Sequence, residues 1–232
     1  MSGTLRRGMR PAHYGSVGHR SSEAEVCVHG FVLGVDLDGV CGDYEAALRA
    51  SVAARLGVDP ETLPPQRSTG HFEEWGLTAE GFREAHRIAV TEDRIFRTMQ
   101  PYPDVAEVLW RLSDEGVWIR VITHRLLFNG LHEASAADTA VWLDQHDIPY
   151  RDLCFIGDKA MVGADVYLDD SPHNIVNLRA AGRTAVVFDQ LYNRHLDGPR
   201  VTAWPEVEPL VLARIDGDPA RASTDEKEDL GG

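Results

Sequence analysis

The stretch Gly30-Phe31-Val32-Leu33-Gly34-Val35-Asp36-Leu37-Asp38-Gly39-Val40 decides the fold of this chain. A short apolar run without alternation ends in two aspartates one residue apart, followed by glycine. Such runs are typical of strands buried on both faces of a parallel sheet. Open α/β sheets place their ligands at the carboxyl ends of these strands. Asp36 and Asp38 are therefore candidate catalytic or metal-binding acids, although Asp-x-Asp-Gly alone is often a solvated turn.

Strand and helix candidates alternate along the rest of the chain. The predicted strands are Phe31–Asp36, Val117–Thr123, Leu153–Ile156, Val166–Asp169 and Thr184–Phe188. The predicted helices are Tyr44–Leu56, Pro103–Glu115, Ala136–His146, Pro172–Ala181 and Pro205–Arg214. Pro103 and Pro172 suit first helical turns, and Gly116 and Gly182 suit helix ends. The alternation predicts an α/β fold with a parallel sheet covered on both faces.

Residues 42–100 break this rhythm, because they contain no strand candidate. An insertion directly after the first strand would overhang the strand ends as a small helical cap, which can exclude water and contact substrate. Its aromatic residues could contact a ligand or form the cap's own core. We therefore predict a core of residues 26–41 and 101–215, a cap of residues 42–100, a disordered basic tail at 1–25 and a disordered acidic tail at 216–232.

Composition limits the classes of partner. The formal net charge of −14 argues against nucleic-acid polymers and anionic membranes as main partners. No apolar run approaches the length of a membrane span, so we expect a soluble protein. The three cysteines have no ligand-like spacing and form no disulfide framework, which points to a reducing compartment and a cytoplasmic location.

Polar residues also stand at the ends of two later strands. Thr123 ends one of them, and a hydroxyl beside turning backbone amides can bind a phosphate oxygen. His124 and Arg125 could help to bind an anion or could be solvated loop residues. Lys159 follows another strand, where its ammonium could neutralise a transferring phosphoryl group. Each has a simpler alternative, such as a satisfied strand end for Thr123 and an exposed position for Lys159.

Asp169 and Asp170 end a further buried-type strand. Adjacent carboxylates beyond an apolar strand are costly unless a cation holds them. Hard oxygen ligands of this number suit Mg²⁺. Alternatively, Asp170 or Ser171 could cap the helix that begins at Pro172. Together, the four strand ends carry the groups that phosphoryl transfer requires, in the order Asp-x-Asp, Thr, Lys and Asp-Asp.

These four motifs resemble those of the haloacid dehalogenase superfamily, in its phosphatase branch. Within it, the chain is similar to the 5′(3′)-deoxyribonucleotidases and their bacterial relatives from about Val32 to Leu212. The resemblance implies a Rossmann-like three-layer sandwich with a helical cap inserted after the first strand. It is carried by Asp36-Leu37-Asp38-Gly39-Val40-Cys41-Gly42-Asp43-Tyr44, by Gly157-Asp158-Lys159 followed by Asp169-Asp170, and by Tyr192-Asn193-Arg194-His195 leading to Trp204.

The resemblance implies a role for each catalytic candidate. Asp36 would be the nucleophile that forms an aspartyl-phosphate. Asp38 would protonate the leaving alcohol and then activate the water that releases phosphate. Thr123 would hold the phosphoryl oxygens, and Lys159 would balance their charge.

It also implies a metal and a class of substrate. Mg²⁺ would be held by Asp36, by the backbone carbonyl of Asp38 and by Asp170, with Asp169 orienting these ligands. The substrate would be a small phosphate, in the first instance a nucleoside monophosphate. His124 stands where deoxyribonucleotidases have a small hydroxyl residue. The other candidate substrate contacts are Tyr44, Phe72 and Trp75.

Two alternatives are kept. A phosphatase of a sugar phosphate or another small metabolite phosphate would use the same motifs and would not need the cap aromatics. A non-catalytic phosphate-binding protein would be expected to have lost Asp36 or Asp38, and both are present. Self-association as a homodimer is left open.

Overall fold

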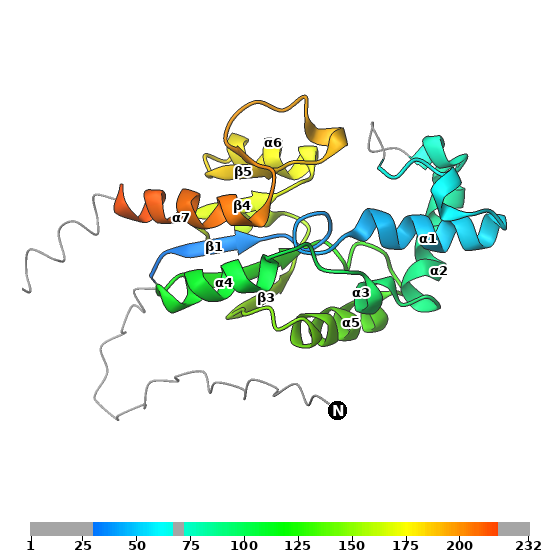
Figure 1. Cartoon of the computed structure of the whole chain (residues 1–232), viewed down its shortest axis with the longest axis horizontal. Coiled ribbons are helices and arrows are strands. Elements are labelled where there is room, and N and C mark those ends of the chain that lie inside the picture. Colours follow the sequence, from blue (N-terminus) through cyan, green and yellow to red (C-terminus); the bar gives the residue numbers. More distant parts are fainter. Residues whose placement is uncertain (1–29, 67–71, 218–232) are drawn as a thin grey trace, which may run out of the picture.

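A six-stranded parallel sheet forms the centre of the protein (Figure 1). The computed structural model describes residues 30–66 and 72–217. The strand order is β3-β2-β1-β4-β5-β6, so β1 lies in the middle of the sheet. The strands are β1 (Val32–Val35), β2 (Trp118–Thr123), β3 (Asp152–Phe155), β4 (Val166–Asp169), β5 (Ala185–Phe188) and β6 (Arg200–Val201).

Helices cover both faces of the sheet, which confirms the predicted α/β class. Alternate strand residues, among them Leu33 and Val35, pack with the helices α4 and α7 in the largest hydrophobic cluster. Residues of opposite parity, such as Tyr167, pack against α6. The helices of this part are α4 (Val105–Asp114), α5 (His132–Gln145), α6 (Pro172–Ala180) and α7 (Val207–Asp216).

Gly34 shows how tightly β1 is enclosed. A Cβ added to this glycine would lie 2.9 Å from Ile122 Cδ1 and 3.3 Å from Tyr167 Cδ1, on the strands at either side. Neighbouring side chains therefore fill the space over the middle of β1. Leu33 and Val35 are fully buried on the opposite face. The strand has no solvated face, which is why its sequence shows no alternation.

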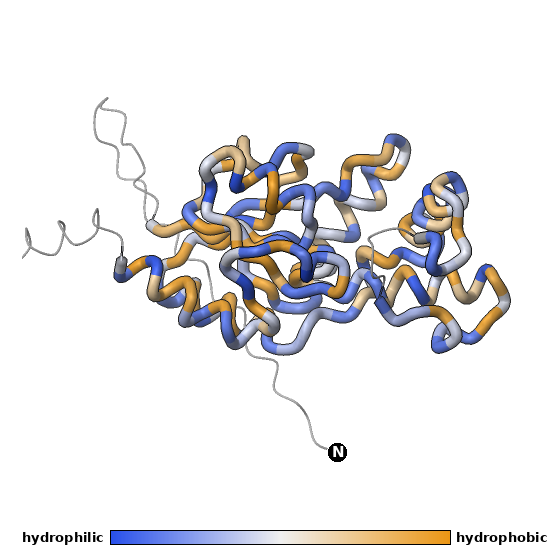
Figure 2. Tube along the Cα trace, turned by 90° about the horizontal axis from the view of Figure 1, so that it is seen from above, coloured by the Kyte–Doolittle hydropathy of each residue, from blue (hydrophilic) through white to orange (hydrophobic). Residues whose placement is uncertain are grey.

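Residues 42–100 form an insertion between β1 and α4. Their helices are α1 (Tyr44–Leu56), α2 (Ala79–Thr91) and α3 (Ile95–Thr98), with short 3₁₀ turns at Pro60–Thr62 and Phe72–Trp75. The described part of this segment contains no strand. Asp43 caps α1 through its side chain, and Gly57 ends it in the left-handed conformation. Figures 1 and 2 show α1 and α2 at one end of the molecule, beyond the carboxyl end of β1.

Hydrogen bonds close the base of the cap segment, and side-chain packing holds it on the core. At the base, where the chain enters and leaves the cap, Asp43 N donates to Gln100 O, and Tyr102 N donates to Cys41 O. Further out, Phe96 of α3 shares a hydrophobic cluster with Leu131, which precedes α5. Trp75 belongs to this cluster as well. The division into cap and core stays a prediction. The described residues between 42 and 100 contain α-helices, 3₁₀ turns and connecting loops.

Several boundaries differ from the predicted ones. Pro103 lies outside α4 because Asp104 adopts a left-handed conformation with φ of 66° just before the helix. Pro205 belongs to a 3₁₀ turn that precedes α7. Helix α5 begins at His132, four residues earlier than predicted, and β6 was not predicted. The predicted basic tail lies outside the described residues, and so does the predicted acidic tail apart from its first two residues. Within the described ranges, no helix is long and apolar enough to cross a membrane.

Candidate active site

The carboxyl ends of β1, β2 and β4 meet at a pocket of about 300 Å³. Of the predicted site residues, this pocket brings together six: Asp36, Asp38, Tyr44, Thr123, His124 and Asp170. The lining is completed by Gly39, Glu45, Ser171, Pro172, Asn174 and Tyr192. Lys159 and Asp169 are buried beside it, and Lys159 contacts both Asp36 and Asp169.

Lys159 joins two of the predicted acids. Its Nζ lies 2.9 Å from Asp36 Oδ2 and 2.6 Å from Asp169 Oδ2, and its side chain is 4% exposed. Burial would lower the pKa of Lys159, but the charges of Asp169 and Asp36 outweigh burial and raise that pKa above its usual value. The ammonium therefore stays charged beside the candidate nucleophile. Lys159 thus lies at the edge of the sheet where the sequence predicts it, beside Asp36.

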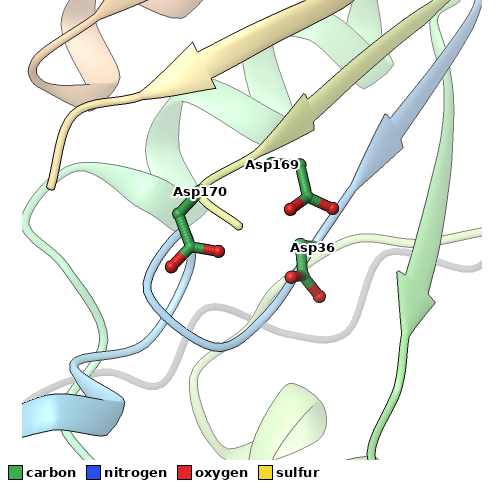
Figure 3. A group of neighbouring side chains, drawn as sticks. All are labelled: Asp36, Asp169 and Asp170. Carbon is green, nitrogen blue, oxygen red and sulfur yellow. The ribbon is translucent and has the colours of Figure 1, made fainter. Parts of the chain in front are cut away.

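Three carboxylates share one buried space. Oxygens of Asp36, Asp169 and Asp170 lie within 4.8 Å of one another, and Figure 3 shows all three groups at the ends of β1 and β4. Burial raises the pKa of Asp36 to about 7, with Lys159 opposing this shift and Asp169 adding to it. Burial, then the charges of Asp169 and Asp36, raise the pKa of Asp170 well above its usual value. One lysine does not balance three acids, so this oxygen set fits a hard divalent cation.

Asp169 and Asp170 have different surroundings. Asp169 is held from behind, because its carboxylate accepts hydrogen bonds from Ser171 N at 2.9 Å and Asn174 Nδ2 at 3.1 and 3.2 Å, in addition to Lys159. Asp170 faces the pocket and accepts from the hydroxyl of Tyr192. Of the two alternatives for the N-cap of α6, Asp170 and Ser171, the structure has Ser171 at the N-cap position, but its side chain makes no capping hydrogen bond. The side chain that accepts from the backbone there is that of Asp169.

Asp38 lies beyond the end of β1, just before the turn at Gly39, and has a different cation. Arg125 Nη2 donates to Asp38 Oδ1 at 2.6 Å, and Arg125 Nε lies 3.2 and 3.1 Å from the two carboxylate oxygens. Two acids that are two residues apart in sequence thus have separate partners, Lys159 for Asp36 and Arg125 for Asp38. This separation allows the two carboxylates to do different chemistry.

Thr123 carries a buried hydroxyl that lacks a hydrogen-bond partner among the described residues. It lines the pocket at the end of β2. A buried polar group is normally paired, so an orphan that faces a pocket is suited to a ligand. His124 Nε2 is likewise buried and unpartnered within the described part of the chain. Burial and the charge of Lys159 lower the pKa of His124, which keeps its imidazole neutral near pH 7.

The loop between Asp36 and Asp43 is fixed by hydrogen bonds. Gly39 has φ of 78°, and its carbonyl accepts from Gln190 Nε2 at 2.7 Å. The carbonyl of Val40 accepts from Trp204 Nε1 at 2.8 Å, and Trp204 is buried. A Cβ at position 39 would collide with the carboxylate of Asp170. Glycine is thus required both for the turn and for the approach of Asp170.

The cap aromatics divide between the site and the cap's own core. Tyr44 lines the pocket, with its hydroxyl hydrogen-bonded to His86 Nδ1 at 2.9 Å and its ring stacked on Phe96. Trp75 is 2% exposed in the hydrophobic cluster of the cap and donates from Nε1 to Pro64 O at 3.0 Å. The structure thus places Trp75 away from the pocket. Phe72 begins a 3₁₀ turn, and its side chain lies outside the description.

Comparison with known proteins agrees with this geometry. Residues 30–216 match the sequence model of the family described as 5′ nucleotidase, deoxy (Pyrimidine), cytosolic type C protein. A protein of Chlorobaculum tepidum named "Putative 5'(3')-deoxyribonucleotidase" is 40% identical over 185 residues, which cover 79% of this chain and 91% of the relative. The chain belongs to this 5′-nucleotidase family. It is therefore an enzyme of the phosphoric monoester hydrolase class, as the resemblance implied.

Solved structures support the same fold. A haloacid dehalogenase-like hydrolase from Streptococcus pneumoniae aligns with a TM-score of 0.53 and 13% identity, covering 78% of this chain and 98% of its own. A haloacid dehalogenase-like protein from Agrobacterium tumefaciens gives 0.52 and 16%, covering 80% and 99%. At this level of identity, the alignments show that this member of the 5′-nucleotidase family has the haloacid dehalogenase-like fold.

Several residues of the 5′-nucleotidase site carried no clear signal in the sequence. Arg125 was read as a residue that binds an anion or lies in solvent, yet it is buried against Asp38. Glu45, in the first turn of α1, lines the pocket and is buried. Asn174 lies in the first turn of α6, five residues after Asp169, and donates to its carboxylate. The sequence gives no signal for this contact, because Asp169 ends β4 and the pair lacks the three- or four-residue spacing of neighbours on a helix.

Proposed function

We propose that the protein is a Mg²⁺-dependent phosphomonoesterase that acts through an aspartyl-phosphate. A carboxylate oxygen of Asp36 attacks phosphorus, the bond from phosphorus to the leaving alcohol breaks, and Asp38 gives its proton to the alcohol oxygen. Asp38 then takes a proton from water as the water oxygen attacks phosphorus. The bond from phosphorus to Asp36 breaks, and inorganic phosphate leaves with the Asp36 carboxylate restored.

One observation carries this proposal. Asp36 stands at the carboxyl end of β1 with Lys159 at 2.9 Å, in a pocket that also receives the unpartnered hydroxyl of Thr123. Lys159 is placed to offset negative charge on a phosphoryl group, and Thr123 to donate to one of its oxygens. Asp38, held by Arg125 on the same pocket, supplies the second carboxylate that a two-step transfer needs.

The oxygen cluster is the site proposed for the metal. Asp36 and Asp170 would hold Mg²⁺, and Asp169 is the acid whose own contacts to Lys159 and Asn174 leave it to orient the others. When bound, Mg²⁺ would supply positive charge that allows an anionic phosphate to approach Asp36. The backbone carbonyl of Asp38 is proposed as a further ligand from the family resemblance.

Nucleoside monophosphates, deoxy forms included, are the proposed substrates. The family description and the name of the C. tepidum relative both specify deoxyribonucleotide phosphatases. Tyr44 is an aromatic ring on the pocket wall, backed by Phe96, and could contact a base. A cytoplasmic location is part of the proposal, because the family is described as cytosolic and the described cysteines, Cys41 and Cys154, are free thiols.

The test measures phosphate release from deoxy- and ribonucleoside monophosphates and from sugar phosphates, with Mg²⁺ and with EDTA. We expect Mg²⁺-dependent release from nucleotides that is abolished by Asp36→Asn. In Asp38→Asn, hydrolysis of the intermediate should slow, whereas its formation from p-nitrophenyl phosphate, whose phenolate leaves without a proton, should continue, so the intact protein should gain the mass of one phosphoryl group after mixing with this ester. That gain should be missing in Asp36→Asn.

Asp147→Asn is the matched control. Asp147 is exposed beyond α5, where asparagine tolerates its φ of 52°. It should release phosphate at the wild-type rate. Release from sugar phosphates alone would keep the chemistry and reject the nucleotide substrate. Activity that survives Asp36→Asn would refute the aspartyl-phosphate. A folded protein that releases no phosphate from any of these esters would point to the non-catalytic alternative.

A further inference from the structure

We propose that Arg125 is a positioning residue that fixes the carboxylate of Asp38, and that cap helix α3 holds Arg125 in place. The proposal rests on the role of Asp38 as proton donor and acceptor under the proposed function. Arg125 lies two residues beyond Thr123 in the loop after β2, on the core side of the site. Arg125 is not among the described residues that line the pocket, so it acts through Asp38.

The contact between the two side chains selects one oxygen of Asp38. Oδ1 receives the short bond of 2.6 Å from Nη2 and a second contact of 3.2 Å from Nε. Oδ2 receives one longer contact, 3.1 Å from Nε. The asymmetric fork ties down Oδ1 and leaves Oδ2 the freer oxygen. We assign to Oδ2 the exchange of the proton with the leaving alcohol and with water.

Arg125 is buried, whereas its partner Asp38 is partly exposed. Its side chain is 1% exposed, whereas that of Asp38 is 26% exposed towards the pocket. Burying a guanidinium is costly, and an apolar side chain in such a position is often no less stable. Several partners of Arg125 offset the cost of burying its charge. The charge then serves one carboxylate, that of Asp38, which stays accessible from the pocket. A purely structural ion pair would not need an exposed partner.

Two of the partners come from the cap. The guanidinium lies 4.2 Å from the centre of the Phe96 ring on α3, and Nη2 lies 3.6 Å from Met99 Sδ just after it. From the core, Thr139 Oγ1 on α5 accepts from Nη1 at 2.9 Å. The arginine fork therefore spans cap, core and Asp38. Lysine would keep the charge but lose the planar fork and the stacking on Phe96.

The test separates proton transfer from binding. A nucleoside monophosphate leaves as an alkoxide that needs a proton, whereas p-nitrophenyl phosphate leaves as a stable phenolate that does not. In Arg125→Lys, we expect kcat/KM for the nucleotide to fall by about 100-fold, since general acid catalysis contributes about 10² to 10⁴. For p-nitrophenyl phosphate, kcat/KM should fall by less than about 5-fold. KM for the nucleotide should change little.

Arg94→Lys is the matched control. Arg94 also forms a fork with a buried aspartate, Asp138 on α5, at 2.6 Å, but does not touch Asp38. It should leave the ratio of the two kcat/KM values unchanged. A second control places Arg125→Lys in the Asp38→Asn background, where it should cause no further loss for the nucleotide because the residue through which it acts is gone.

The outcomes distinguish this inference from the proposed function. An equal loss on both esters, or a further loss in the Asp38→Asn background, would overturn the positioning role while leaving phosphatase chemistry intact. A wild-type protein that hydrolyses neither ester would overturn both. If Arg125→Lys does not fold, Thr139→Val removes one partner of Arg125 without touching Asp38. It should shift the ratio in the same direction by a few-fold, and an unchanged ratio would overturn the inference.

Discussion

Replacing Trp204 tests most directly what holds the loop between Asp36 and Asp43. Its indole Nε1 donates to the carbonyl of Val40 at 2.8 Å across 164 residues of sequence, and it is 1% exposed. The loop that this bond restrains contains Asp38 and begins at Asp36. We predict that Trp204→Phe both destabilises the protein and lowers its activity, because phenylalanine fills most of the space but cannot donate.

The size of the effect follows from the contacts. A buried carbonyl that loses its donor costs about 1–3 kcal/mol. The missing part of the indole leaves a small cavity that adds about 1 kcal/mol. Together the free energy of unfolding should fall by about 2–4 kcal/mol, which for a chain of this size lowers Tm by roughly 5–15 °C. A loop shifted by a fraction of an ångström would lower kcat by about 10- to 100-fold.

The assay combines urea unfolding with steady-state kinetics, and the chain offers a matched comparison. Trp142 is also fully buried, and its Nε1 donates to Met99 O at the same distance of 2.8 Å. Trp142→Phe should lose a similar free energy of unfolding, yet its kcat should fall less because its acceptor lies outside the loop. Equal losses of kcat in the two variants, or a Trp204→Phe variant as stable as the wild type, would refute the reasoning.

Three further predictions concern two residues of the site, Gly39 and Thr123, and His86, which bonds to Tyr44. Gly39→Ala should weaken Mg²⁺ binding in a calorimetric titration by at least about 10-fold, because left-handed alanine is strained by about 1–2 kcal/mol and its Cβ would displace Asp170; unchanged affinity would contradict this. Thr123→Val should leave the free energy of unfolding within about 0.5 kcal/mol of wild type, since the hydroxyl has no partner among described residues. Inhibition by inorganic phosphate should weaken by about 10- to 100-fold, and equal inhibition would exclude the contact. Burial lowers the pKa of His86 below 6.5, so the unfolded chain binds the proton first and the stability from His86 is full above about pH 7 and lost as pH falls. Urea unfolding between pH 5 and 8 should show a shallower loss in His86→Gln, and parallel curves would refute this assignment.

The site could be predicted in part because parallel strands end at one edge of a sheet. Four motifs far apart in sequence each follow an apolar run, and topology alone brings them together. Strand ends alone were enough to place four residues at this edge of the sheet, without any side-chain detail: Asp36, Thr123, Lys159 and Asp169. The same reasoning fails for β6, because a strand of two residues has no pattern of its own. It also fails for Pro103, since the left-handed Asp104 delays the helix and nothing in the sequence signals that conformation.

Arg125 could not be predicted for a different reason. A charged residue in a loop after a strand looks the same whether it is solvated or buried, and its partner Asp38 is 87 residues away in sequence. What buries Arg125 is the packing of α3 from the cap against α5 from the core, which depends on where the cap comes to rest. Trp75 illustrates the converse, since an aromatic residue that the sequence offers as a substrate contact packs in the core of the cap. Local patterns report on strand ends, whereas cap placement is a property of the assembled fold.

The arrangement around Asp36 and Asp38 shows why the two acids of one short motif need different surroundings. On an extended strand, their side chains would point the same way and repel each other. The strand ends at Val35, and the following loop, held at Gly39 by Gln190 and at Val40 by Trp204, lets each carboxylate meet its own cation. Lys159 lies in the core and pairs with Asp36 and Asp169, two of the acids of the proposed metal site. Arg125 is coupled to the cap, so under the proposed mechanism the group that moves protons is the one whose position depends on the cap being in place.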